Sequence, residues 1–206
     1  FILGKSNKKS DKFDVIVFAK RNIEIPIIPS NIQSIGPCSF HECGQFHSIQ
    51  FQSDSKLQKI DEKAFLSSSI QSITIPSSVR EIGKSSFCYC FELEKVEFEK
   101  DSELELIDQM AFLESRIHTI RIPEKTKKIC DGSFKYCENL RCIEILGDEI
   151  CLGEGCFIDI QINSIISMPN SQKVSIHQNS FKKSVLFVNC GTKILFVDLY
   201  DHVLND

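Results

Sequence analysis

The stretch SSIQSITIPSSVREIGKSSFCYCFELEKVEF, residues 68–98, contains the two phrases from which most of the chain is built. One phrase, residues 82–87, places a small residue and then phenylalanine four and five positions after an isoleucine. The other reads apolar-x-x-apolar-x-apolar and occurs at residues 70–75 and 93–98. Its last apolar residues alternate with polar ones, which predicts a short strand with one face turned inward.

Both phrases recur along the chain. The phenylalanine of the first phrase stands at positions 40, 65, 87, 112, 134, 157 and 181. The copies at 40, 87, 134 and 181 are each 47 residues apart, and an Ile-Pro pair and a cysteine keep the same step. The shared positions are Ile28-Pro29, Ile75-Pro76 and Ile122-Pro123 for the pair, and Cys43, Cys90 and Cys137 for the cysteine. Such a period indicates tandem units of two alternating kinds.

One unit of about 23 residues cannot bury its apolar face alone, so the units are expected to stack on one another. We therefore predict a leucine-rich-repeat solenoid of the α/β class, rich in β-structure. A parallel sheet should form one face, with turns or short helical stubs on the other. The recurring phenylalanines should form an aromatic spine in the core.

The stretch 68–98 resembles the BspA-like class of leucine-rich repeats, whose units read roughly IPxxVxxIGxxAFxxCxxLxxVxI. The resemblance covers about residues 13–190. Gly83 matches the family glycine, whereas Asp61, Asp108 and Cys130 depart from it. Members of this family are typically surface antigens or adhesins of mucosal bacteria and protozoan parasites, so the resemblance implies recognition of a macromolecule without catalysis.

No composition shift marks a domain boundary, so residues 1–206 are expected to form one solenoid of seven or eight coils over 13–190. Residues 191–206 drop the pattern and are a possible C-terminal cap. Because the chain begins with Phe1 and not methionine, we expect a piece of a longer protein. The expected location is the cell surface or the extracellular space, as part of that longer chain.

The alternative is a cytoplasmic scaffold. Ten cysteines that look reduced and the lack of any Asn-x-Ser/Thr sequence favour this second reading.

Several function classes are not supported by the sequence. No apolar run approaches the ~18 to 20 residues that cross a bilayer, and a net charge of -4 gives no footprint for nucleic acid. No phosphate loop, nucleophile elbow or HExxH sequence occurs. His47 and His118 share a column three coils apart, too distant to bind one ion. We expect no enzyme activity, no metal and no cofactor.

The cysteines are expected to be buried thiols. Cys43, Cys90 and Cys137 lie two coils apart, roughly 9 to 10 Å at ~4.8 Å per strand. A disulfide needs Cα atoms within about 7 Å. Cys151 and Cys156 also align with apolar residues and are expected in the core.

The remaining candidates are side chains on the exposed face of the predicted sheet, in three columns. One column reads Gln50, Thr74, Glu97, Arg121, Glu144 and Ile166. Its neighbour reads Ser48, Ser72, Lys95, Thr119, Cys142 and Ser164, and the third reads His47, Gln71, Glu94, His118, Arg141 and Asn163. Glu97, Arg121 and Glu144 should form a ladder of opposite charges.

We predict that this face binds a protein partner, either a host-cell or extracellular-matrix component or a protein of the same cell. The residues expected to contact it are Lys95, Glu97, His118, Arg121, Arg141 and Glu144. The alternative is that these side chains only keep the sheet soluble.

Overall fold

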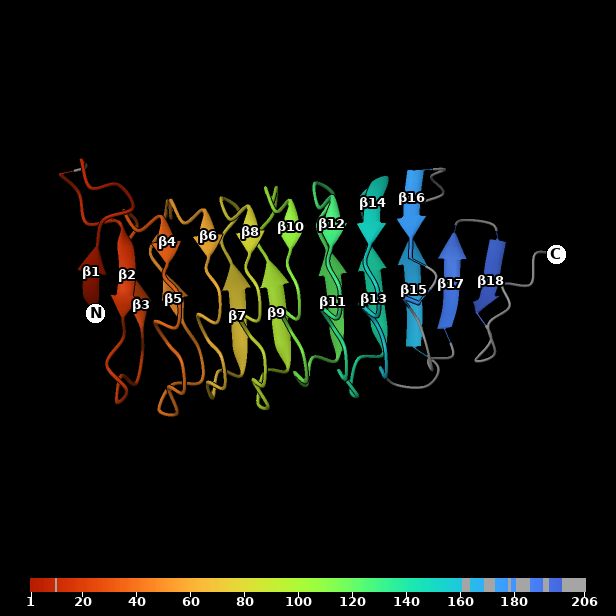
Figure 1. The fold of residues 1–206 in the computed structure, drawn as a ribbon, viewed down its shortest axis with the longest axis horizontal. Helices are drawn as coiled ribbons and strands as arrows, with labels where there is room; N and C mark the ends of the chain where they lie inside the picture. The colour runs from red at the N-terminus through yellow and green to blue at the C-terminus, as the bar shows by residue number, and fades with distance from the viewer. Residues whose placement is uncertain are drawn as a thin grey trace.

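The computed structural model describes residues 1–9, 11–160, 164–168, 173–177, 179–180, 186–190 and 193–197. The coils stack along the long axis of the molecule, with strand β1 near one end and strand β18 near the other (Figure 1). Strands of successive coils lie side by side in two large sheets. The solenoid predicted from the repeats is confirmed.

The nine-stranded sheet contains, in spatial order, β1 (Ile2–Gly4), β2 (Val15–Phe18), β4 (Ser34–Ile35), β6 (Lys59–Ile60), β8 (Glu81–Ile82), β10 (Leu106–Ile107), β12 (Lys128–Ile129), β14 (Glu149–Leu152) and β16 (Lys173–Ile176). The seven-stranded sheet contains β7 (Ser72–Ile75), β9 (Lys95–Phe98), β11 (Thr119–Ile122), β13 (Cys142–Ile145), β15 (Ser164–Met168), β17 (Leu186–Cys190) and β18 (Lys193–Val197). A two-stranded sheet pairs β3 (Ile27–Ile28) with β5 (Gln50–Phe51). All these strand pairs are parallel except β1/β2 and β17/β18, which are antiparallel.

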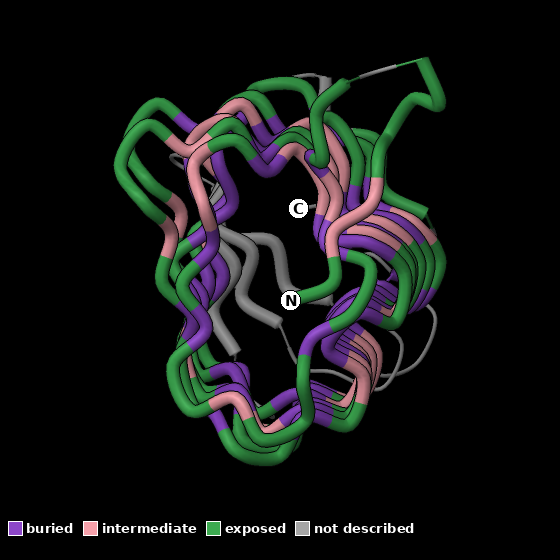
Figure 2. Tube along the Cα trace, turned by 90° about the vertical axis from the view of Figure 1, so that its left-hand side faces the viewer, coloured by how far each residue is buried: buried purple, intermediate pink, exposed green. Residues whose placement is uncertain are grey.

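The predicted aromatic spine runs through the core. Six phenylalanines have no exposed surface, and their rings stack in chain order: Phe40, Phe65, Phe87, Phe112, Phe134 and Phe157. Successive ring centroids lie between 4.8 and 5.4 Å apart. Viewed down the solenoid, buried positions line the inside of the ring formed by the coils (Figure 2). Phe181, the predicted last member, lies outside the described residues.

The prediction of short helical stubs is wrong, because the described residues contain no helix. Each spine phenylalanine lies in a run of turns whose peptide groups bond to the next coil. The N–H of Phe87, for example, donates to the carbonyl of Ala111 at 2.7 Å. The turns also contain residues with positive φ four apart, such as Ser85 at 53° and Tyr89 at 58°. A left-handed residue in each turn prevents the chain from continuing as a helix.

The second face is therefore a parallel sheet rather than turns alone. Its strands are mostly two residues long and begin the phrase that ends in phenylalanine. Ile60, Ile82, Ile107 and Ile129 pair in register across β6, β8, β10 and β12. This pairing is continuous from coil to coil, so the second sheet holds the stack together behind the seven-stranded sheet.

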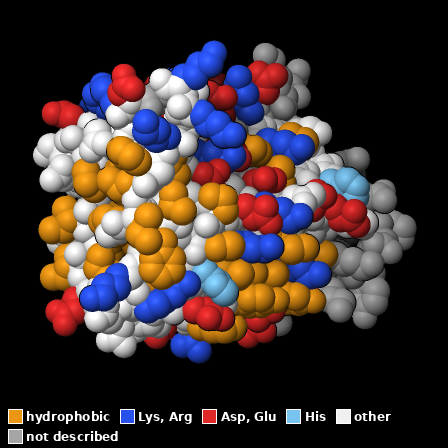
Figure 3. Space-filling model, turned by 60° about the vertical axis from the view of Figure 1, so that its left-hand side comes forward, with side chains coloured by type: hydrophobic (Ala, Val, Ile, Leu, Met, Phe, Trp, Pro, Cys, Tyr) orange, Lys and Arg blue, Asp and Glu red, His pale blue; other side chains and the backbone are white. Residues whose placement is uncertain are grey.

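The N-terminal end of the molecule exposes many apolar side chains (Figure 3). Phe1 packs edge-on against Phe40 with ring centroids 5.8 Å apart, so its ring extends the spine toward this end. Phe13, Val17, Ile25 and Ile27 are each at least half exposed.

The predicted number of coils and the predicted cap both extend into residues that the structure does not describe. Within residues 191–206, strand β18 pairs antiparallel with β17 from Lys193 to Val197. The count of seven or eight coils over 13–190 and the capping role of 191–206 remain predictions.

Candidate functional site

The seven-stranded sheet aligns the predicted columns of exposed side chains as far as β13. Lys95 lies beside Ser72 and Thr119, and Thr119 lies beside Cys142. Beyond β13 the predicted columns are wrong by one residue. Cys142 pairs with Ile165 and Glu144 with Ser167, instead of Ser164 and Ile166, because this coil is one residue longer than the assumed spacing.

Pairing between the strands is uneven. Strands β7 and β9 pair over four residues, and so do β11 and β13. Between β9 and β11 only Lys95 and Thr119 pair, and 47 residues earlier only Ser48 and Ser72 do. We call these two weakly paired junctions, β5/β7 and β9/β11, the seams. From β3 to β13 the coils are therefore docked in pairs that follow the 47-residue period. The junction 47 residues after the β9/β11 seam differs, because β13 and β15 pair over three residues.

Proline contributes to each seam. At a fully paired junction, the residue after a strand donates its N–H to the preceding coil, as Leu146 does to the carbonyl of Ile122 at 3.1 Å. Pro123 occupies the corresponding position after β11 and has no N–H to donate. Phe98, its expected acceptor on β9, therefore loses this bond. Pro76 stands in the same place at the β5/β7 seam.

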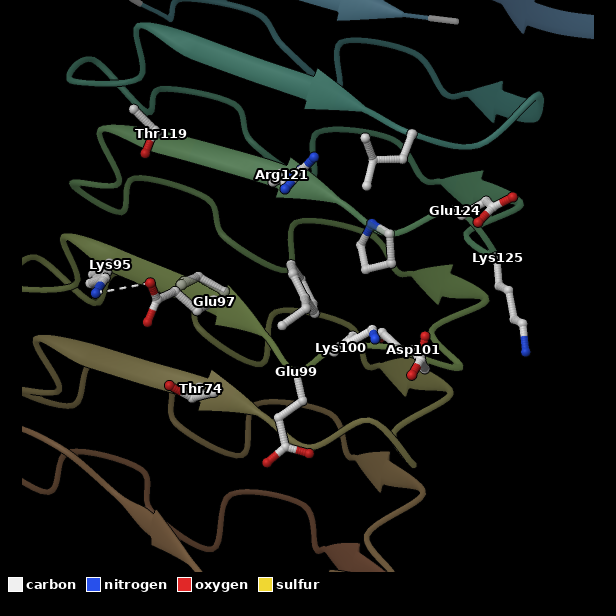
Figure 4. A pocket seen from close by; sticks show the side chains of 15 residues that line it. Thr74, Lys95, Glu97, Glu99, Lys100, Asp101, Thr119, Arg121, Glu124 and Lys125 are labelled. Atoms are coloured by element: carbon white, nitrogen blue, oxygen red, sulfur yellow. Dashed lines mark ion pairs between the residues drawn. The ribbon is translucent and has the colours of Figure 1, made fainter.

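The β9/β11 seam opens into a groove of about 720 Å³ on the exposed face of the sheet (Figure 4). Its apolar wall is formed by Phe98, Pro123 and Leu146. Lys95 and Glu97 lie at one end, and charged side chains from the loops that follow β9 and β11 lie at the other. These loop residues are Lys100, Asp101, Glu124 and Lys125. An apolar wall bordered by charged side chains is typical of a protein-binding surface.

Three predicted contact residues, Lys95, Glu97 and Arg121, line this groove. The predicted charge ladder forms only in part. Arg121 pairs with Glu144 at 2.9 Å across β11 and β13, but Glu97 pairs with Lys95 of its own strand, also at 2.9 Å. The reason is the seam, since β9 and β11 separate beyond Lys95 and Thr119.

The other three predicted contact residues, His118, Arg141 and Glu144, do not line the groove. His118 and Arg141 directly precede β11 and β13, where the backbone N–H of Arg141 donates to the carbonyl of His118 at 2.9 Å. Both residues are exposed at the opposite ends of these strands from Pro123 and Leu146. The structure thus brings together Lys95, Glu97 and Arg121, with Glu144 joined through its ion pair.

The sequence columns missed the residues that make the groove. The repeat pattern predicts an inward position for Phe98 and a strand end at Pro123, and it does not single out Leu146. One signal was available: Pro follows every second strand phrase, and the missing N–H weakens the junction with the preceding coil.

The loop that follows β11 contacts the loop that follows β9 through an ion pair. Lys125 donates to Glu103, which Arg80 also approaches at 3.8 Å. The hydrogen bond from Lys125 lowers the pKa of the Glu103 carboxyl. Both side chains are solvent-exposed, so this contact adds little stability.

The cysteines do not form a reactive or metal-binding site in the described part of the chain. Cys43, Cys90, Cys137 and Cys156 are buried as predicted, and burial raises the pKa of Cys90 and of Cys137 to about 12. The prediction for Cys151 is wrong: it aligns with Lys128 on the second sheet and is exposed. Among the described residues, no three His, Cys, Asp or Glu side chains converge to hold a metal ion.

The fold and the groove define a solenoid repeat protein with a candidate protein-binding face. A family model described as the BspA type leucine rich repeat region, in six copies, matches residues 12–141 and 105–191. The chain therefore belongs to the BspA-type leucine-rich repeat family. No curated protein matches the sequence significantly.

Solved structures share this fold. A leucine-rich repeat protein from Bacteroides ovatus is 20% identical, with a TM-score of 0.52 over 79% of this chain and 63% of its own. A leucine-rich repeat protein of T. pallidum is 22% identical, with a TM-score of 0.52 over 62% and 61%. A leucine-rich cell surface protein from Faecalibacterium prausnitzii is 17% identical, with a TM-score of 0.49 over 81% and 60%. The chain thus spans less than two thirds of each structure's length.

Among the described residues there is also no helix that is long and apolar enough to cross a membrane.

Proposed function

We propose that this chain is a non-catalytic binding module that recognises a protein partner through the exposed face of its seven-stranded sheet. The groove at the β9/β11 seam carries the proposal. It combines an apolar wall with ion pairs at an exposed sheet surface, and repeat solenoids commonly bind through such extended faces. Membership of a family of surface antigens supports display on the cell surface.

A charge-reversal experiment tests the binding face. The folded chain serves as bait against surface extracts of a foreign cell and against lysate of the source organism. Glu97→Lys with Arg121→Glu places like charges beside Lys95 and Glu144 without changing the net charge. These side chains are exposed, so folding should be preserved. Capture of a partner by the wild type and its loss in this variant is the expected result.

The matched control is a second swap on the other sheet. Lys128→Glu with Glu149→Lys alters two exposed residues of β12 and β14 and also keeps the net charge. This control should retain the partner. A partner that binds both variants as well as it binds the wild type would exclude the sheet face as the binding surface.

A second function, a scaffold inside the cell, is favoured by the thiols. The side chains of nine cysteines are described, and all nine are free. Cys38, Cys142 and Cys151 are exposed and can report location. A thiol reagent that cannot enter cells should label them on intact cells if the protein is on the surface. Labelling only after permeabilisation would support the intracellular scaffold instead.

A further inference from the structure

The first two pairs of coils share a hydrogen bond that the third pair lacks. In the first pair, the side-chain carbonyl oxygen of Gln52 accepts the N–H of Ser30 at 3.1 Å. In the second pair, 47 residues later, a carboxylate oxygen of Glu99 accepts the N–H of Ser77 at 2.8 Å. In each case the donor follows the proline of the first coil, and the acceptor directly follows the strand of the second coil.

The third pair has the same backbone but a different side chain. The N–H groups of Gln52, Glu99 and Leu146 donate to the carbonyls of Ile28, Ile75 and Ile122 at 3.0, 3.0 and 3.1 Å. The three positions are therefore structurally equivalent. The side chain of Leu146 has no oxygen to accept a hydrogen bond, and the N–H of Glu124 has no acceptor within the described part of the chain.

This unpaired N–H belongs to a residue that lines the groove. Glu124 directly follows Pro123, which forms the apolar wall with Phe98 and Leu146. Lys100 lies at the same end of the groove and makes no ion pair among the described residues (Figure 4). A donor, a free cation and an apolar wall thus occur together at one end of the groove.

The loop that follows β11 lacks the hydrogen bonds that tie the equivalent loop after β7 to the preceding coil, which leaves this end of the groove accessible. At the earlier seam, the hydroxyl of Ser78 donates to the carbonyls of Ser55 and Leu57 at 2.9 and 2.8 Å. These bonds tie the loop after β7 to the preceding coil. The equivalent residue at the β9/β11 seam is Lys125, whose ammonium binds the exposed Glu103 side chain instead.

We propose that the groove binds an extended segment of the protein partner that carries an acidic side chain next to a large apolar residue. The partner's carboxylate accepts the N–H of Glu124, as Glu99 does for Ser77 within this chain. Lys100 lines the same groove and can pair with the partner's carboxylate in competition with Asp101, and the apolar residue packs against Phe98, Pro123 and Leu146. This inference rests on the proposed binding function and specifies the chemistry of the partner.

The test restores the missing acceptor within the chain. Leu146→Glu should bond to the N–H of Glu124 in the way Glu99 bonds to Ser77, and should thereby occupy the partner's position. Gln52→Leu is the matched control, because it makes the opposite exchange at the equivalent position of the first pair, away from the groove. Thermal unfolding of each variant checks that it folds.

The probe is a displayed library of short random peptides, selected on the wild-type chain. We expect enrichment of peptides with Asp or Glu beside a large apolar residue. Leu146→Glu should weaken their binding about tenfold or more, the size expected from loss of a charge-assisted hydrogen bond, whereas Gln52→Leu should not. Failure to enrich such peptides, or equal binding to Leu146→Glu, would overturn the inference.

The amide of Glu124 provides a direct readout in ¹H–¹⁵N spectra. An enriched peptide should shift this resonance and slow its hydrogen exchange toward that of Ser77. Leu146→Glu should cause the same change without peptide. An unshifted Glu124 amide in the peptide complex would contradict the proposed contact.

The Leu146→Glu test of the acidic contact can fail without the failure of the proposed binding function. A captured partner that binds Leu146→Glu normally but is lost in the Glu97/Arg121 swap would refute the acidic contact and leave the sheet face as the binding surface. A partner indifferent to both changes would refute both.

Discussion

A single phenylalanine fills one layer of the spine. Phe87 has no exposed surface and stacks between Phe65 and Phe112, with centroids 5.0 and 5.2 Å away. Phe87→Ala should lower the free energy of unfolding by about 3 to 5 kcal/mol, because it leaves a cavity in the middle of the stack. Chemical denaturation measures this change.

Phe91→Ala is the matched control for that measurement. Its ring is 51% exposed and contacts Tyr89 at the surface, so the change should cost about 0.5 kcal/mol or less. Equal effects of the two substitutions would contradict the spine as the main source of stability.

Thr126 is a buried polar residue at a position that is apolar in the other pairs. Ile32, Val79 and Thr126 each donate an N–H to the proline three residues before. The Thr126 hydroxyl is fully buried and has no hydrogen-bond partner in the described structure. Thr126→Val should therefore stabilise the protein by about 1 kcal/mol, since an unsatisfied hydroxyl is replaced by a methyl group of similar size.

Thermal or chemical unfolding of Thr126→Val measures the gain, and Thr119→Val on the exposed sheet face controls for the residue exchange itself. A loss of stability in Thr126→Val would show that the hydroxyl has a partner after all.

Thiol reactivity should separate the cysteines by position. The thiolate is the reactive form, and a pKa of about 12 keeps Cys90 and Cys137 protonated at neutral pH. Alkylation of the folded chain should modify Cys38, Cys142 and Cys151, which are exposed. Peptide mass spectrometry reads the pattern, and denatured protein gives the full labelling as reference.

Burial of these thiols also predicts how stability depends on pH. The folded pKa of Cys90 is raised from 9.0 to about 12, so the folded state holds its proton where the unfolded state releases it. This contribution to stability is complete below about pH 9 and is lost as pH rises toward 12. Rapid labelling of Cys90 or Cys137 in the native protein at neutral pH would contradict both statements.

The elements that the sequence predicts best are those whose side chains repeat. The columns through β13 and the buried phenylalanines followed from the 47-residue period, because that period fixes which side chains face inward. The predicted helical stubs are absent from the described residues, because the N–H groups near Ser85 and Phe87 donate to the next coil and not within a helix. The groove was also missed: it depends on backbone pairing at Pro123 and on a single exchange, Glu99 to Leu146, that leaves the apolar pattern unchanged.

Hydrogen exchange should detect the seam between β9 and β11. Arg121 and Glu144 hold equivalent positions, but Arg121 pairs with no residue of β9, whereas Glu144 pairs with Arg121. The amide of Arg121 should therefore exchange faster than that of Glu144 in the native protein. Glu97, which pairs with Thr74 on β7, is the second protected reference. Equal protection at all three amides would show that the seam is closed in solution.

At the scale of the whole molecule, the apolar N-terminal end should promote self-association. Among the described strands, β3 pairs with β5 alone, and Ile25 and Ile27 are exposed by 61% and 50% beside its other edge. Ile25→Lys with Ile27→Lys should reduce concentration-dependent association, because charges on an edge strand oppose pairing with another copy. Sedimentation velocity over a range of concentrations measures this.

Glu24→Lys with Asn22→Lys adds charge in the same region without removing apolar surface and serves as the control. Association that falls equally in both variants would indicate a general charge effect instead of contact through the apolar end.

The docking of coils in pairs limits how a gene for such a repeat protein can lengthen by duplication. Duplicating one coil would place two coils of the same kind next to each other, and the proline-bearing strand would meet the wrong neighbour. Duplicating two coils, 47 residues, preserves every junction and adds one new seam. Recombination that copies whole pairs would therefore lengthen the protein and multiply its candidate grooves together, and each new copy could diverge at the position of Leu146 alone to acquire its own specificity.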